Sequence, residues 1–170
     1  MTKKLTQLGL FLALALILAY VESLIPFSFG IPGIKLGLPN LIVLLLLYQG
    51  SAKEAFLINI LRIVLSGFLF SNLYAILYAL AGAFLSFAAM LIGRRMRCFS
   101  AIGVSVLGGV LHNIGQIIVA MIVVETVYVG YYVPFLMAAG TVTGAVLGIV
   151  TMELMPYLVR FTDHGQHIAR

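Results

Sequence analysis

The sequence GIPGIKLGLPNLIVLLLLYQ, residues 30–49, places a lysine, two prolines and an asparagine directly before one of the most apolar stretches of the chain. Pro39 suits the first turn of a helix, because a proline there lacks only an N–H group that has no helical partner anyway. The residues from Leu36 to Gln49 would form a helix of only about 21 Å, whereas the core of a bilayer measures about 30 Å. The sequence therefore predicts a non-helical segment that dips into the membrane and leads into a short helix beginning near Leu38.

The apolar character of this stretch extends over the whole chain. Of 170 residues, 63% are hydrophobic and 9% are charged, whereas soluble proteins average about 45–50% and about 25%. Because the apolar residues are spread along the full length, we expect a single all-α membrane domain over residues 1–170, built as a six-helix bundle. A membrane-spanning helix needs about 20 residues, and the candidate spans are approximately residues 7–25, 36–49, 52–70, 72–92, 101–124 and 132–158.

The charged residues predict how this bundle is oriented. Ten lysines and arginines give a formal charge of +5. Most of them lie between candidate spans or near the termini, at Lys3, Lys4, Lys53, residues 94–97, Arg160 and Arg170. With the N-terminus in the cytoplasm, all of these fall on the cytoplasmic side, as the positive-inside rule requires for an even number of spans. We therefore expect both termini in the cytoplasm, a bacterial-type cytoplasmic membrane, and the lipid bilayer instead of nucleic acid as the partner of the basic residues.

Lys35 and Arg62 do not fit this pattern. Lys35 belongs to the outer half of the protein, where it could bind an anionic or polar ligand beside a helix N-terminus with free N–H groups, or extend to the lipid headgroups. Arg62 lies halfway along the third candidate span, where a charge costs roughly 2.5–3.5 kcal/mol. Arg62 should therefore be paired or face a cavity. Glu22 and Glu125, at the outer ends of the first and fifth candidate spans, are possible ion-pair or proton partners.

The fifth candidate span contains LHNIGQ, residues 111–116, with three hydrogen-bonding side chains in mid-membrane. His112 and Gln116 are four residues apart, and Asn113 and Gln116 are three apart, so they share one face of a helix or its edge. They could bind a polar ligand through several donors and acceptors, and His112 could also carry a proton. The alternative is that they hydrogen-bond to neighbouring helices, at roughly 0.6–2 kcal/mol per bond.

These polar side chains lead us to expect one pocket that opens toward the outside, with aliphatic residues lining the rest of it. Its two cations would favour a ligand with an anionic or carbonyl-rich end, and flavin-like, quinone-like or prenyl phosphate molecules would all fit. The predicted substrate-binding residues are Lys35, Asn40, Arg62, His112, Asn113 and Gln116.

Small residues at a four-residue spacing allow membrane helices to approach closely. The first candidate span has Ala15 and Ala19, and the sixth has Gly140, Gly144 and Gly148. Both sets could be used for packing inside the bundle, or the first set could face another protein.

Three motifs, GIKLGLPNLIVLLLLY, LRIVLSGFLFSN and GGVLHNIGQIIVA, resemble the Gx transporter family, which is also labelled heptaprenyl diphosphate synthase component I, over about residues 7–155. This family is related to the substrate-binding S components of ECF transporters. The resemblance implies a six-helix membrane protein that binds a vitamin-like micronutrient near its outer face. It also implies docking, through small residues of the first helix, onto a transmembrane coupling subunit with two ATPases. That role would fall to Ala15 and Ala19.

The sequence argues against catalysis by this chain. Prenyl diphosphate synthases of the usual kind hold Mg²⁺ and diphosphate with clusters of aspartates, whereas this chain has five acidic residues and a single aspartate, Asp163. It also lacks a glycine-rich phosphate loop, so ATP would act only through a separate subunit. We expect the binding component of a small-molecule uptake system, without a metal or cofactor of its own. The alternatives are a proton-coupled transporter that works alone and a non-catalytic membrane subunit of isoprenoid or quinone synthesis.

Overall fold

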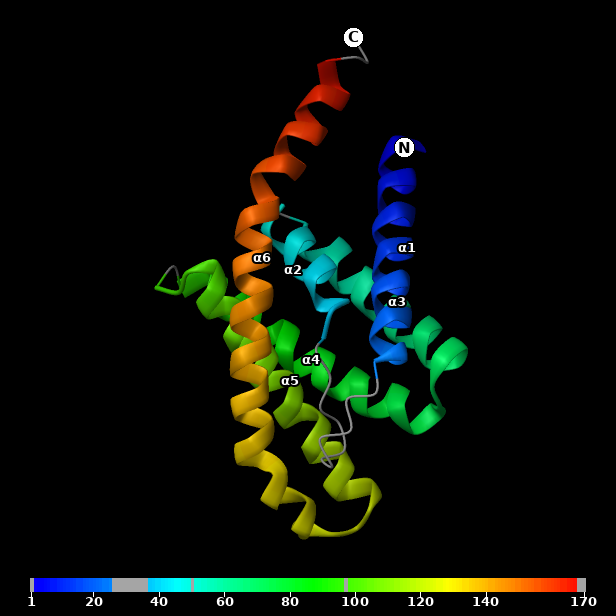
Figure 1. Cartoon of the computed structure of the whole chain (residues 1–170), viewed down its shortest axis with the longest axis vertical. Helices are drawn as coiled ribbons and strands as arrows, with labels where there is room; N and C mark the ends of the chain where they lie inside the picture. The colour runs from blue at the N-terminus through cyan, green and yellow to red at the C-terminus, as the bar shows by residue number, and fades with distance from the viewer. Residues whose placement is uncertain (1, 26–36, 50, 97, 168–170) are drawn as a thin grey trace.

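The computed structural model describes residues 2–25, 37–49, 51–96 and 98–167, and the regular structure in these residues is entirely helical. The prediction of an all-α chain is confirmed for these residues. In chain order, the elements in Figure 1 are α1 (Thr2–Leu24), α2 (Asn40–Tyr48), α3 (Ala52–Phe70), α4 (Leu73–Met96), α5 (Ala101–Val123), the 3₁₀ helix η1 (Val127–Tyr132) and α6 (Val133–His167).

Several of these helices are suited to a lipid environment. Among the described residues, four segments are long and apolar enough to cross a membrane, and they are Lys4–Leu24, Leu73–Met96, Ala101–Val123 and Val127–Leu158. The chain is therefore a multi-pass membrane protein. α3 has a suitable length of 19 residues but contains three charged ones, Lys53, Glu54 and Arg62.

α2 is a short helix enclosed by the rest of the bundle. Its nine residues extend over about 14 Å, less than half of a bilayer core, so it is even shorter than predicted. It begins at Asn40, after the predicted start near Leu38, and most of the expected non-helical segment lies outside the described residues. Residues 42–47 are all buried, because the helix is apolar on every side and has no face suited to solvent.

Contacts between helix ends show that the basic residues gather at one end of the bundle. Lys4 in the first turns of α1 forms an ion pair with Glu54 in the first turn of α3. Arg94, near the end of α4, donates a hydrogen bond to the backbone carbonyl of Leu47, and its guanidinium carbon lies 5.5 Å from the ring centroid of Tyr48. Figure 1 shows the start of α1 and the end of α6 at the same end of the molecule. This arrangement is the one that the positive-inside rule requires if both termini are cytoplasmic.

The glycine stripe of α6 is used for packing inside the chain. A Cβ atom on Gly140 would lie 2.7 Å from the carbonyl oxygen of Gly109 in α5, and one on Gly144 or Gly148 would lie 2.7 Å from a Cα atom of α5. The two backbones therefore approach as closely as small residues permit. Of the two alternatives for small-residue stripes, internal packing holds for α6.

Replacing Gly109 by alanine is expected to destabilise the contact between α5 and α6, because the new Cβ would lie 2.4 Å from the carbonyl oxygen of Gly140. Backbone atoms cannot rotate away as a side chain can, so the helices must move apart, at a cost of about 1–3 kcal/mol. The measurement is the midpoint of thermal unfolding in detergent. Gly9→Ala in α1 is the matched control, because its Cβ would meet no atom within 4 Å. Equal midpoints for the two variants would contradict the close packing.

The alanines of α1 do not form the free docking face that was expected. Ala15 has no exposed surface and Ala19 is only 9% exposed, because this side of α1 packs against α2 and α3. Ala15 belongs to the same apolar core as residues 42–47. Of the two alternatives for this stripe, internal packing therefore holds for both alanines in this structure, and docking through Ala15 and Ala19 onto another protein stays a prediction.

Candidate functional site

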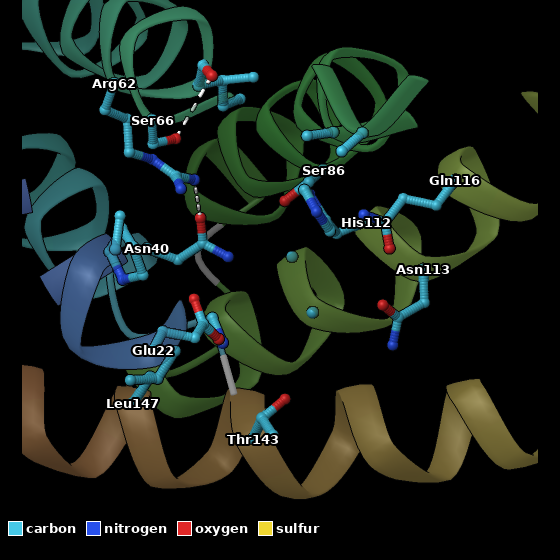
Figure 2. Close-up of a pocket in the computed structure, with 18 of the residues that line it drawn as sticks. Glu22, Asn40, Arg62, Ser66, Ser86, His112, Asn113, Gln116, Thr143 and Leu147 are labelled. Carbon is cyan, nitrogen blue, oxygen red and sulfur yellow. Dashed lines mark hydrogen bonds between the residues drawn. The ribbon is translucent and has the colours of Figure 1, made fainter. Parts of the chain in front are cut away.

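A cavity of about 370 Å³ lies inside the bundle, and all six α-helices contribute to its lining. Its volume falls in the range of about 300–1,000 Å³ that is usual for small-molecule sites. Five of the six predicted substrate-binding residues line it, as Figure 2 shows, and these are Asn40, Arg62, His112, Asn113 and Gln116. The sixth, Lys35, lies outside the described residues. Side chains from three helices that are distant in sequence therefore meet around one space.

Arg62 is the most extensively bonded residue of the lining. Its side chain is 8% exposed. Its Nε and Nη2 atoms donate hydrogen bonds to Oδ1 of Asn59 at 3.1 and 2.8 Å, and Nη2 also donates to Oδ1 of Asn40. The carboxylate of Glu22 in α1 is close enough to interact with it electrostatically. Arg62 therefore faces the cavity while its guanidinium is hydrogen-bonded within the chain, and these bonds connect α3 to α2.

Of the two acids considered as partners of Arg62, only Glu22 lines the cavity. Its Oε1 atom accepts a hydrogen bond from the backbone N–H of Gly37 at 2.5 Å. Gly37 has a φ of +69°, which glycine adopts without strain, and this turn aims its N–H at α1. Glu125 is instead exposed just after α5, outside the lining. The expectation that Glu125 could pair with Arg62 is thereby corrected, because the packing brings Glu22 to that place.

The start of α2 does not supply the free N–H groups that were expected there. The N–H groups of Asn40, Leu41 and Ile42 donate to the carbonyl oxygens of residues 37, 38 and 39, at 2.8, 3.1 and 3.2 Å. A tight turn ahead of the helix thus satisfies donors that a helix N-terminus normally leaves open. The prediction of an anion site at this helix end is therefore wrong for these three N–H groups.

The three polar residues of α5 have different surroundings: one of them bonds to α6, and the other two face the cavity. Asn113 donates a hydrogen bond from Nδ2 to the carbonyl oxygen of Leu136 in α6 at 2.6 Å, which is the interhelical role considered from the sequence. His112 and Gln116 pack against Gly82 of α4, where a Cβ atom would lie 2.9 Å from Nδ1 of His112. Both remain partly exposed within the lining, so they are the members of this group best placed to contact a ligand.

A family model described as heptaprenyl diphosphate synthase component I matches residues 11–154. The chain belongs to the heptaprenyl diphosphate synthase component I family, also called the Gx transporter family. The matched range includes all of the described cavity lining, which extends from Ala19 to Leu147. Comparisons with curated proteins and with solved structures gave no match to the chain.

Several polar residues in or beside the cavity of this component I protein were missed by sequence reasoning, and the most buried of them are Asn59, Ser86 and Ser105. Asn59 lies one helical turn before Arg62, and this three-residue spacing could have indicated that the two side chains bond to each other. Ser86 and Ser105 are each 6% exposed and line the cavity, and neither hydroxyl forms a hydrogen bond to any part of the chain that the structure describes. Because no described side-chain oxygen is both buried and without a partner, these two hydroxyls reach the open space of the cavity, where they could bind water or a ligand.

Proposed function

We propose that this component I protein is the membrane-embedded binding component of an uptake system for a small molecule, of the ECF S-component type. The observation that supports the proposal most directly is the convergence of Asn40, Arg62, His112 and Gln116 on a cavity of about 370 Å³. Polar groups in the membrane interior are costly, so a set of them around an open space is a strong indication of function. The volume suits a small metabolite better than a long polyprenyl chain.

The lining residues support entry of the ligand from the end of the bundle that we expect to face outward. Ser71 and Ala75, at the turn between α3 and α4, line one part of it, and this turn is at the opposite end of α3 from Lys53. Toward the basic end, residues 45–47 of α2 are at most 3% exposed, and Arg94 bonds to the last buried carbonyl of that helix. We expect a ligand to enter near the α3–α4 turn and to be held between this turn and α2.

Uptake of this type would require partner subunits. Because the sequence has no phosphate-binding loop, a coupling subunit with a pair of ATPases would supply the energy. The family name supports a second candidate function, a non-catalytic membrane subunit that assembles with a heptaprenyl diphosphate synthase. His112 and Glu22 line the same cavity, which is the arrangement that proton-coupled transport by the chain alone would use.

Affinity purification from native membranes in a mild detergent distinguishes these functions. We expect a coupling subunit and two ATPases to co-purify, and mass spectrometry of the denatured sample to detect a small molecule. Recovery of a soluble prenyl diphosphate synthase would support the second candidate, and uptake by the protein alone in liposomes would support the solitary transporter. Preparations that contain no small molecule, with or without partners, would contradict the binding role.

Filling the cavity is expected to displace the bound molecule. Ala79 of α4 lines the cavity, and a phenylalanine there should lower the amount of co-purified ligand by about tenfold or more, a loss of at least ~1.4 kcal/mol in binding. The measurement is ligand per protein by mass spectrometry, together with the midpoint of thermal unfolding. Ala13→Phe is the matched control, because Ala13 is exposed on α1 outside the lining. If Ala79→Phe folds and keeps its full ligand content, the ligand is bound elsewhere.

A further inference from the structure

The charges in the described lining of the cavity balance each other. Among the described lining residues, Arg62 is the basic side chain and Glu22 the acidic one, so these two charges are opposite in sign, and His112 is the further titratable group. Arg62 and Glu22 interact electrostatically, and Lys35 lies outside the described residues. Arg62, one of the two cations that were expected to attract an anionic ligand, therefore already has the opposite charge of Glu22 on the same cavity lining.

Within the described residues, the start of α2 does not add a positive end to this site. The first N–H groups of α2, which point toward an anion in many binding sites, are bonded to the carbonyl oxygens of the preceding turn. An anion in the cavity would have to separate Glu22 from Arg62 or lie beside the carboxylate. Both arrangements are unfavourable in a low-dielectric interior, where like charges repel strongly and an ion without a partner is destabilising.

Other polar groups of the described lining occupy two sides of the cavity. Figure 2 shows Asn40 and Arg62 on one side and His112 and Gln116 on the other, with Ser86 between them on α4. Amide, imidazole and hydroxyl groups each offer both donors and acceptors. The hydroxyl of Ser86 is still without a hydrogen bond to the described chain, so a ligand that spans the cavity would meet polar groups at both of its ends.

We infer that the cavity binds a small uncharged or zwitterionic molecule with hydrogen-bonding groups at both ends, and that Glu22 excludes organic anions such as phosphate esters. This inference rests on the proposed binding function and specifies its ligand class. It removes prenyl phosphates from the ligands that two cations had suggested, and it makes Glu22 a residue that determines specificity.

Titration with inorganic diphosphate tests the role of Glu22. The purified wild-type protein should show no binding in calorimetry and no shift in its unfolding midpoint at millimolar diphosphate. Glu22→Gln should bind diphosphate at least about tenfold more tightly, because the charge of Arg62 is then unmatched. The glutamine keeps an oxygen that can accept the N–H of Gly37, so the turn is retained. Glu125→Gln is the matched control, since it removes the same charge from an exposed residue outside the lining.

Two outcomes would overturn the inference. The first is wild-type protein that binds diphosphate as tightly as Glu22→Gln does, and the second is a folded Glu22→Gln variant that gains no diphosphate binding. Retention of the native co-purified compound on an anion exchanger at neutral pH would also overturn it. The proposed function fails by a different result, the absence of any bound small molecule, and this result does not depend on the diphosphate titration.

Discussion

Replacing Arg62 by leucine is expected to lower the free energy of unfolding by about 2–6 kcal/mol, because the Oδ1 atoms of Asn40 and Asn59 would each lose a charged donor at about 1–3 kcal/mol. Arg62 is 8% exposed and donates to Asn40 and Asn59. Without it, the cavity would also lose the positive charge that interacts electrostatically with Glu22. Binding of the native ligand should be lost as well, because the α1–α2–α3 side of the cavity depends on this network.

A double-mutant cycle with Glu22→Gln checks this explanation. Combining Arg62→Leu with Glu22→Gln removes both charges, so the double variant should be more stable than the sum of the single effects predicts, by about 1 kcal/mol or more. Arg62→Lys should be intermediate, because it retains the charge but cannot reproduce the forked hydrogen bonds of a guanidinium. An Arg62→Leu protein with a wild-type unfolding midpoint would show that the network contributes nothing to stability.

The helices could be predicted because the apolar residues of membrane segments reveal their length directly. α3 occupies the predicted residues 52–70, and α5 ends one residue before the predicted 124. α6 continues past Pro156 to His167, beyond the predicted end at 158, because the apolar pattern ends before the helix does. Hydropathy does not show which neighbours a helix has, so α2 was treated as a short span although other helices enclose it.

The candidate site could be predicted in part because a polar group in lipid is unfavourable whatever its neighbours are. That argument selected Arg62 and the polar residues of α5, and these do line the cavity. It does not give the direction in which a residue at a helix end points, so Glu22 and Glu125 looked equivalent. It is also weak for serine, whose hydroxyl can bond to its own helix backbone, and Ser86 and Ser105 were missed for that reason.

Gln116→Leu and Asn113→Leu are expected to separate ligand binding from helix packing within one turn of α5. Gln116 lines the cavity and forms no hydrogen bond to the described part of the chain. Leucine has nearly the same size, so Gln116→Leu should leave the unfolding midpoint unchanged. It should weaken binding of the co-purified compound by about 10–100-fold, since a polar group of the ligand would be buried without a partner.

Asn113→Leu should show the opposite pattern. Its amide joins α5 to α6 through the carbonyl of Leu136, and the loss of such a bond between membrane helices amounts to about 0.6–2 kcal/mol of stability. Binding should change less than in Gln116→Leu, because the donor atom of Asn113 is already used. The checks are the unfolding midpoint and a titration with the recovered compound for each variant. If both variants lose stability and neither loses affinity, the polar face of α5 serves only to hold helices together, and the ligand must depend on the Arg62 side of the cavity.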